Sequence, residues 1–173
     1  MTKKQTVSYA GLFDDVAAEA WYAPAVDYVK YGRLMYGTGN NLFQPDAQMT
    51  RAMFAQVLYA LEGSPSVKGL SCPFTDAGGS WYTDAVIWAY HAGVVAGVSA
   101  TQFAPNEVLT REQMVTMLYG YAGREETLSG SDGALASYQD QASVSSWARE
   151  AMAWAVSTGV ITGTSTTTLA PQK

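Results

Sequence analysis

Apolar side chains in the middle of the chain recur at the spacing of an α-helix. They fall at positions i, i+4, i+7, i+8 and i+11 of one segment, and these positions share one face of a helix. The residues concerned are Trp81, Ala85, Trp88, Ala89 and Ala92. The pattern predicts an amphipathic helix that begins near Trp81 and holds both tryptophans on its buried side.

A second helix is predicted to begin at Thr110. Thr110 and Gln113 have the spacing of a capping box, in which each side chain accepts a hydrogen bond from the other residue's backbone N–H. Gly123 is expected to end this helix, because glycine adopts the left-handed C-terminal conformation at little steric cost. The apolar positions expected to be buried are Met114, Val115, Leu118 and Tyr121.

The helix-loop-helix unit recurs three times along the chain, and its third copy is incomplete. Trp21-Tyr22 matches Trp81-Tyr82 at an offset of 60 residues, and Trp147 follows Trp81 at an offset of 66. Many further matches at the same two offsets identify an internal repeat. The copies span residues 13–63, 74–123 and 138–173. Each opens on an aromatic residue followed two positions later by aspartate, and these aspartates are Asp15, Asp76 and Asp140.

The first copy differs from the second at two structural positions. Met53 stands where the second copy has Gln113, so only half of a capping box is expected at Thr50. Gly32-Arg33 replaces the Ala92-Gly93 order, so an altered turn is expected after the first helix. The second helix of this copy is expected to bury Phe54, Val57, Leu58 and Leu61 and to end at Gly63.

The third copy departs furthest from the pattern. Leu169 stands where the others have Phe43 and Phe103. Its Thr-Arg pair would fall at positions 176 and 177, after Lys173, so we expect this sequence to lack the second helix of the third copy. The stretch 129–133, rich in Gly and Ser, is expected to be a mobile linker before this copy.

Composition narrows the possible partners. With 48% hydrophobic and 14% charged residues the chain can form a packed core. The net charge of −5 and the absence of a basic stripe argue against nucleic acid as a partner. No apolar run is long enough for membrane insertion. Residues 1–12 lack the apolar stretch of a signal peptide, so this sequence does not indicate an export route.

The residues that could carry enzyme chemistry are few. Cys72 is the single cysteine and His91 the single histidine, and neither has a partner at catalytic or metal-ligand spacing. No nucleophile with its base, metal-ligand set or phosphate-binding glycine loop is present. We therefore expect a protein that is not an enzyme and uses no cofactor and no metal.

The repeats resemble the S-layer homology (SLH) repeat of bacterial cell-surface proteins. The resemblance rests on the aromatic-x-Asp opening, the Trp-containing first helix, the Gly-x(5)-Phe-x-Pro loop and the Thr-Arg pair, and it covers the chain from about Phe13 to Pro171. It implies an all-α, mainly helical fold, in which three helix-loop-helix repeats form a pseudo-threefold, three-pronged spindle around a central helical bundle.

The resemblance also implies a function. SLH repeats anchor proteins to secondary cell wall polysaccharides, often pyruvylated, through grooves between neighbouring repeats. Carried over by position, the arginines would bind an acidic group through two parallel hydrogen bonds. The aspartates would accept sugar hydroxyls or brace the loop, and the glycines would let the backbone approach the ligand. The ligand-binding candidates are Arg51, Arg111, Asp15, Asp76, Asp140, Gly37, Gly97, Gly163, Trp21, Trp81 and Trp147.

Structural interpretations compete with these roles. Each arginine could be a surface residue or pair with a nearby carboxylate, although its first-turn position opposes the helix dipole. The carboxylates considered are Asp46 for Arg51 and Glu112 for Arg111. Each aspartate could cap the following loop. We favour a buried structural role for Trp21, Trp81 and Trp147 over sugar stacking, because Trp81 and Trp147 lie on the apolar stripe.

The leading hypothesis is a non-catalytic anchoring module at the bacterial cell surface that binds wall polysaccharide. The alternative is a helical-repeat module that binds protein, or that self-associates through apolar surface left by the incomplete third repeat. The sequence does not specify the glycan, the organism, the cargo, the oligomeric state or whether Lys173 is a natural end.

Overall fold

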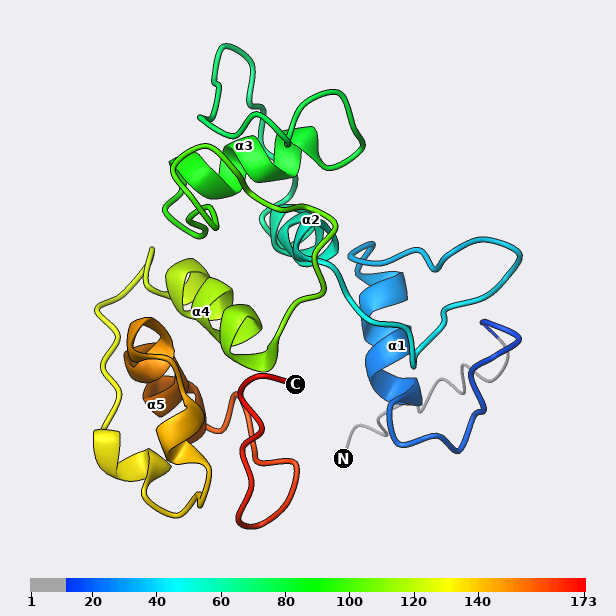
Figure 1. Ribbon diagram of the computed structural model, residues 1–173. Helices are drawn as coiled ribbons and strands as arrows, with labels where there is room; N and C mark the ends of the chain where they lie inside the picture. Colours follow the sequence, from blue (N-terminus) through cyan, green and yellow to red (C-terminus); the bar gives the residue numbers. More distant parts are fainter. Residues whose placement is uncertain (1–11) are drawn as a thin grey trace, which may run out of the picture. The chain divides into compact units, whose positions relative to one another are not determined.

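The computed structural model describes residues 12–173, and the regular secondary structure of this part is helices joined by long loops (Figure 1). The described part of the chain contains no strand, only two isolated β-bridges, so the all-α prediction is confirmed. The pseudo-threefold spindle stays a prediction. The α-helices are α1 (Ala23–Tyr31), α2 (Arg51–Leu61), α3 (Thr83–His91), α4 (Arg111–Ala122) and α5 (Arg149–Ser157), and the short 3-10 helices are η1 (Asp132–Leu135), η2 (Gln141–Ser143) and η3 (Ser146–Ala148).

The chain divides into two compact units between Gln48 and Met49. The first contains α1 and the loops on either side of it. In the second, α2 packs against α3 and α4 packs against α5 (Figure 1). Thus the second helix of one repeat packs on the first helix of the next.

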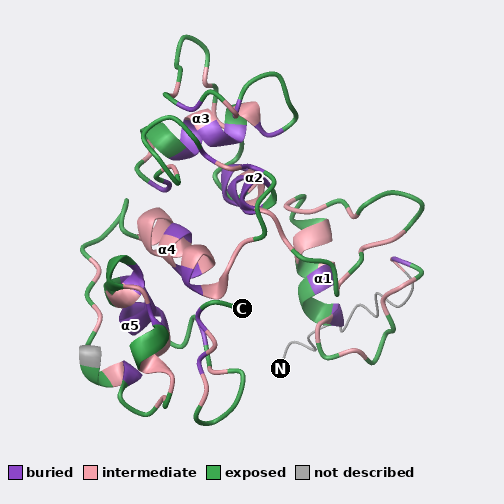
Figure 2. Cartoon of the chain, viewed as in Figure 1, coloured by how far each residue is buried: buried purple, intermediate pink, exposed green. Residues whose placement is uncertain are grey.

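Two apolar clusters hold the second unit together, and their buried residues lie on all four of its α-helices (Figure 2). One cluster joins α2 to α3, and the other joins α4 to α5. Met114 and Leu118 of α4 contact both clusters. The prediction for α2 is confirmed at Phe54 and Leu58 but wrong at Leu61, which is exposed because it lies at the end of the helix.

The first tryptophan of each repeat lies outside the helix that follows it. Trp21, Trp81 and Trp147 are 90%, 61% and 57% exposed, so the favoured prediction that they are buried is wrong. The helices begin two residues later, and the helical period does not apply to a side chain in the preceding turn. Trp88 on α3 is buried as predicted, and its counterpart Trp154 on α5 is buried too.

The predicted capping box of α4 is present. Thr110 Oγ1 accepts from the Gln113 N–H at 3.3 Å, and Gln113 Oε1 accepts from the Thr110 N–H at 3.2 Å. The expectation of half a box at Thr50 is wrong, because Met53 Sδ accepts from the Thr50 N–H at 3.5 Å. Sulfur is a weak acceptor, but Met53 Sδ occupies the position that Gln113 Oε1 has in the second repeat.

The two helix-ending glycines behave differently. Gly63 has a φ of 82°, as the left-handed C-terminal conformation requires. Gly123 has a φ of −66°, so the prediction of a left-handed cap is wrong there.

The segment 129–133 was expected to be a mobile linker, but it packs closely against its neighbours. A Cβ on Gly130 would lie 2.4 Å from the backbone N of Trp154. This linker packs directly against α5.

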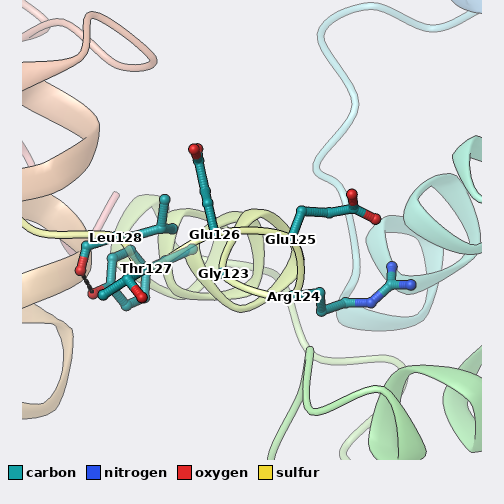
Figure 3. A pocket seen from close by; sticks show the side chains of 7 residues that line it. Gly123, Arg124, Glu125, Glu126, Thr127 and Leu128 are labelled. Carbon is teal, nitrogen blue, oxygen red and sulfur yellow. Dashed lines mark hydrogen bonds between the residues drawn. The ribbon is translucent and has the colours of Figure 1, made fainter.

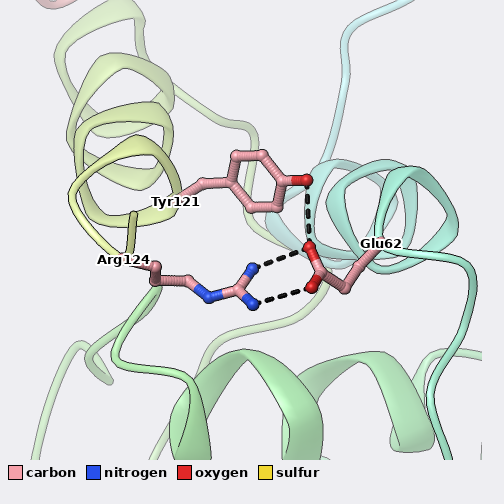
Figure 4. A network of polar contacts seen from close by, with 3 residues as sticks. All are labelled: Glu62, Tyr121 and Arg124. Carbon is pink, nitrogen blue, oxygen red and sulfur yellow. Dashed lines mark hydrogen bonds and ion pairs between the residues drawn. The ribbon is translucent and has the colours of Figure 1, made fainter. Parts of the chain in front are cut away.

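An ion pair joins the C-terminal ends of α2 and α4 (Figure 4). Arg124 donates two hydrogen bonds of 2.8 Å to the Glu62 carboxylate, which also accepts one of 3.1 Å from the Tyr121 hydroxyl. The guanidinium lies 5.4 Å from the centroid of the Trp88 ring and 5.3 Å from that of Tyr121. These cation–π contacts add to the two-point pairing of the guanidinium with the carboxylate.

Within residues 12–173 no helix is long and apolar enough to cross a membrane. The expectation that the N-terminal segment is not a signal peptide concerns residues that, apart from Leu12, lie outside the described part of the chain.

The Glu62 pair predicts a pH dependence of stability. Hydrogen bonding to Arg124 lowers the pKa of Glu62 from 4.5 to about 2. A lowered pKa in the folded state contributes stability that is present above pH 4.5 and is lost as the pH falls toward about 2. Glu62→Gln should therefore lower the free energy of unfolding at pH 7 by about 1 kcal/mol and have little effect near pH 2. Urea unfolding between pH 7 and 2 checks this, with Glu126→Gln as the control; equal pH profiles of the two variants would contradict it.

Arg33 predicts a stabilising substitution. It has a φ of 58°, where the matching residues of the other repeats are Gly93 at 70° and Gly159 at 73°. A side chain in this conformation costs about 1 kcal/mol, partly offset because glycine makes the unfolded chain more flexible. Arg33→Gly should raise the free energy of unfolding of the first unit by about 0.5 kcal/mol, and Arg33→Ala should not. Hydrogen exchange of the α1 amides measures the difference.

Candidate functional site

Arg51 begins α2, but its side chain leaves that helix and binds the loop of the next repeat. Its Nε donates to the Phe103 carbonyl at 2.8 Å and its Nη2 to the Ala96 carbonyl at 3.2 Å. The guanidinium lies 4.7 Å from the centroid of the Phe103 ring. Arg51 is only 6% exposed, so the interpretation as a surface arginine is wrong.

Arg111 repeats this geometry one repeat later. Its Nε donates to the Leu169 carbonyl at 3.1 Å and its Nη2 to the Thr162 carbonyl at 2.7 Å. Thr162 and Leu169 lie 66 positions after Ala96 and Phe103, so the two arginines occupy equivalent places. The contact needs only the backbone of the loop, and it therefore survives the change from phenylalanine to leucine.

The first backbone N–H groups of α2 and α4 also donate hydrogen bonds to carbonyls of the next repeat. The Arg51 and Ala52 N–H groups donate to the carbonyls of Glu107 and Pro105, each at 3.0 Å. The N–H groups of Arg111 and Glu112 donate at 2.9 and 3.0 Å to the carbonyls at the matching positions, Lys173 and Pro171. These N–H groups have no partner inside a helix, and here the neighbouring loop supplies one.

Burial lowers the pKa of Arg51, and the nearby charges of Glu107 and Asp76 oppose that shift. Burial likewise lowers the pKa of Arg111. An arginine nevertheless keeps its proton in a folded protein. Each helix start therefore carries a fixed positive charge into the interface between repeats.

The opening aspartates brace the loops that receive the arginines. The two carboxylate oxygens of Asp76 accept from the backbone N–H groups of Phe103 at 2.9 Å and Ala104 at 2.8 Å. The pKa of Asp76 is lowered: burial acts to raise it, but the two backbone hydrogen bonds outweigh burial. Asp15 and Asp140 make the same paired contacts in their own repeats, and these contacts lower the pKa of each.

This brace holds an unfavourable backbone conformation. The residue after the loop aromatic or leucine has a positive φ in every repeat: 58° at Gln44, 58° at Ala104 and 52° at Ala170. None is glycine, so the carboxylate offsets a conformational cost. Of the two roles considered for the aspartates, the structure contains the loop-bracing contact.

The loop glycines lie against the opening aromatic ring. A Cβ on Gly97 would lie 2.5 Å from Phe74 and 2.4 Å from two loop carbonyls. Gly163 approaches Tyr138 in the same way, and Gly37 approaches Phe13. The close approach at these glycines is thus made by the repeat's own aromatic side chain.

A groove in the second unit brings three predicted site residues together. Arg51, Gly97 and Trp147, one from each repeat, line a hollow of about 520 Å³. Among the described residues, two of the five N–H donors of Arg51 have acceptors. The other lining residues are Val94, Val95, Ala96, Val98, Gln113, Thr116 and Met117.

The remaining predicted residues lie elsewhere. Arg111, Trp81, Asp76, Asp140 and Gly163 belong to the second unit but do not line this groove. Asp15, Gly37 and Trp21 belong to the first unit. The sequence did not identify Thr116 or Met117 as site residues, because the helical pattern of α4 does not reveal which face borders a groove.

A second hollow, of about 560 Å³, lies at the C-terminal end of α4 (Figure 3). Glu125 and Glu126 line it, and the guanidinium of Arg124 is paired with Glu62. The carbonyl of Leu128 on its wall accepts from the Tyr119 hydroxyl. Because its carboxylates repel anions, this hollow does not suit an acidic ligand.

Glu112 has a role that the sequence did not indicate. Considered as a partner of Arg111, it instead accepts from the Ser145 N–H at 2.9 Å, the Ser145 hydroxyl at 2.7 Å and the Gln172 amide at 2.7 Å. It is 2% exposed. A buried carboxylate is tolerated here because these three donors satisfy it. Within residues 12–173 no group of three or more His, Cys, Asp or Glu side chains could hold a metal ion.

Comparison with known proteins gives a consistent result. The chain is 32% identical over 154 residues to an endoglucanase of Bacillus sp. (strain KSM-635), and the aligned region covers 86% of this chain and 16% of that protein. It is 27% identical to an amylopullulanase of Thermoanaerobacterium thermosulfurigenes, over 95% of this chain and 9% of that protein. It is 26% identical to an S-layer protein of Bacillus thuringiensis subsp. finitimus, over 93% of this chain and 19% of that protein.

The chain thus spans less than a fifth of the length of each of these relatives, which share one region although their names differ. The model of the S-layer homology domain matches three segments, residues 12–55, 73–115 and 137–173. These segments coincide with the three repeats and with the loops and helix starts that carry the arginine contacts. The chain belongs to the S-layer homology domain family.

Proposed function

We propose that this chain is a non-catalytic module that holds a protein at the bacterial cell wall by binding an acidic wall polysaccharide. The supporting observation is the groove in which Arg51, Gly97 and Trp147 of three repeats meet. Family membership supports the same function, because an S-layer protein and an endoglucanase both contain this region. The site of action would be the cell surface.

The groove combines features that suit such a ligand. Arg51 is fixed by two carbonyls and the Phe103 ring, so its free edge is positioned before a carboxylate arrives. The exposed Trp147 ring can lie against an apolar sugar face. The side chains of Gln113 and Thr116 add a polar amide and a hydroxyl for sugar hydroxyls.

The acid group of the ligand provides the first test. The chain should be retained on purified pyruvylated wall polymer and at least tenfold less on the same polymer after depyruvylation, because a charge-assisted hydrogen bond contributes about 1.5–3 kcal/mol. Sedimentation with insoluble polymer measures the bound fraction. Equal retention on both polymers would rule out the acidic-ligand mechanism.

Substitution of the tryptophan provides the second test. Trp147→Ala should weaken polymer binding about fivefold, which corresponds to the loss of about 1 kcal/mol of ring contact. Trp81→Ala is the matched control, because Trp81 is equally exposed and occupies the same motif position but does not line this groove. Isothermal titration with a soluble polymer fragment would measure both, and equal losses would contradict the assignment of this groove.

A further inference from the structure

A sulfur atom caps the start of α2. Met53 Sδ accepts from the Thr50 N–H at 3.5 Å, and Thr50 Oγ1 accepts from the Met53 N–H at 3.3 Å. At the matching place in α4, Gln113 Oε1 accepts from the Thr110 N–H at 3.2 Å. The Thr50 N–H therefore bonds to a thioether where the second repeat supplies an amide oxygen, and a thioether is the weaker acceptor.

Met53 is also open to solvent. Within residues 12–173 it is the only exposed methionine, at 38%, whereas Met117 and Met152 are buried. The remaining methionines of this part, Met35, Met49 and Met114, are half-buried. Peroxides oxidise the methionine thioether to a sulfoxide, and an exposed sulfur is reached more readily than a buried one. In the folded chain Met53 is therefore the methionine that peroxide reaches first.

Oxidation has opposite consequences at the surface and in the core. It turns an apolar side chain into a polar one, which would disrupt the clusters that contain Met117 and Met152. At Met53 the sulfur lies at the surface and already faces a backbone N–H. The sulfoxide oxygen extends one bond from Sδ and would accept this N–H at about 2.9 Å. The unbranched side chain has enough torsional freedom for the sulfur to withdraw and the oxygen to take its place.

The cap acts on the junction between repeats. The N–H groups of Arg51 and Ala52 donate to the neighbouring loop, while those of Thr50 and Met53 are satisfied within the cap. All four belong to the first turn of α2 or its N-cap, which an N-cap interaction stabilises. A stronger acceptor at residue 53 would therefore hold more firmly the turn from which Arg51 reaches the Phe103 carbonyl.

We propose that Met53 is a site of oxidative modification, at which peroxide forms a methionine sulfoxide that strengthens the cap of α2. A lone pair of Sδ attacks one peroxide oxygen, so an S–O bond forms and the O–O bond breaks. The second oxygen leaves as hydroxide and takes the proton of the transferred oxygen to give water. Sulfur loses two electrons and the peroxide gains two. Methionine sulfoxide reductases reverse the change. The proposal is independent of glycan binding.

Peptide mapping of the full chain tests the selectivity. Trypsin cleaves after Arg51 and Lys68, so Met53 is the single methionine of the 52–68 peptide, and Met152 is that of the 150–173 peptide. Under dilute hydrogen peroxide, mass spectrometry should show Met53 gaining one oxygen at least tenfold faster than Met152. In concentrated urea the two rates should converge, because burial no longer protects Met152. Similar rates in the folded chain would overturn the proposal.

Hydrogen exchange of the Thr50 amide, followed by NMR, tests the cap itself. In the fraction oxidised only at Met53, this exchange should slow at least threefold, and methionine sulfoxide reductase should restore the original rate. The Thr110 amide is the internal control, because its acceptor is Gln113 and its exchange should not change. Unchanged or faster exchange of the Thr50 amide after oxidation would overturn the proposal.

Two variants separate the acceptor from the oxidation. Met53→Gln copies the cap of the second repeat, so it should slow exchange of the Thr50 amide as oxidation does. Met53→Leu keeps the apolar side chain but removes the acceptor, so it should speed this exchange. Neither rate should respond to peroxide. A peroxide effect on the Thr50 amide that persists in Met53→Leu would show that another residue is responsible and would overturn the proposal.

Discussion

The structure of the second unit depends on one contact, made twice: the start of a Thr-Arg helix bonded to the backbone of the next repeat's loop. At each place two backbone N–H groups of the helix and two N–H groups of one guanidinium donate to four loop carbonyls. These donors would otherwise be buried without partners, so the contact fixes both the register and the direction of docking. A cation in the first turn of a helix opposes the dipole, but here the side chain turns away from its own helix toward carbonyl oxygens.

The loop of each repeat can accept these hydrogen bonds because contacts within the repeat fix its conformation. An aspartate binds two consecutive N–H groups, and the second belongs to a residue with a positive φ in each repeat. The opening aromatic ring lies against the loop glycine on the other side. Loop carbonyls that are fixed before docking lose little entropy when the arginine binds. The aspartates, glycines and opening aromatics therefore act on the site through the loop's shape.

The same contact explains how a groove arises at the junction of repeats. Arg51 donates two hydrogen bonds to the neighbouring loop and also lines the hollow beside it, together with Trp147 of the third repeat. Arg51 thus has a structural role, and in the proposed function the same residue would also bind the ligand. An acidic protein can carry a local positive charge in this way, and in the proposed function the charge at the groove, not the net charge, would meet the ligand.

The sequence by itself determined the repeats, the helices, the cap at Thr110 and the family, because all of these follow from spacing along the chain. Two predictions from local sequence were wrong. At Trp81 the helical periodicity was extended two residues beyond the start of the helix, and at Gly123 the glycine was expected to adopt a left-handed conformation. Only the tertiary structure decided that Arg51 binds carbonyls some fifty positions away, that Glu112 is satisfied by Ser145 and that Trp147 shares a groove with Arg51. Periodicity predicts which side chains share one face of a helix. The residues that cover this face belong to another repeat, so the spacing of residues within one repeat does not identify them.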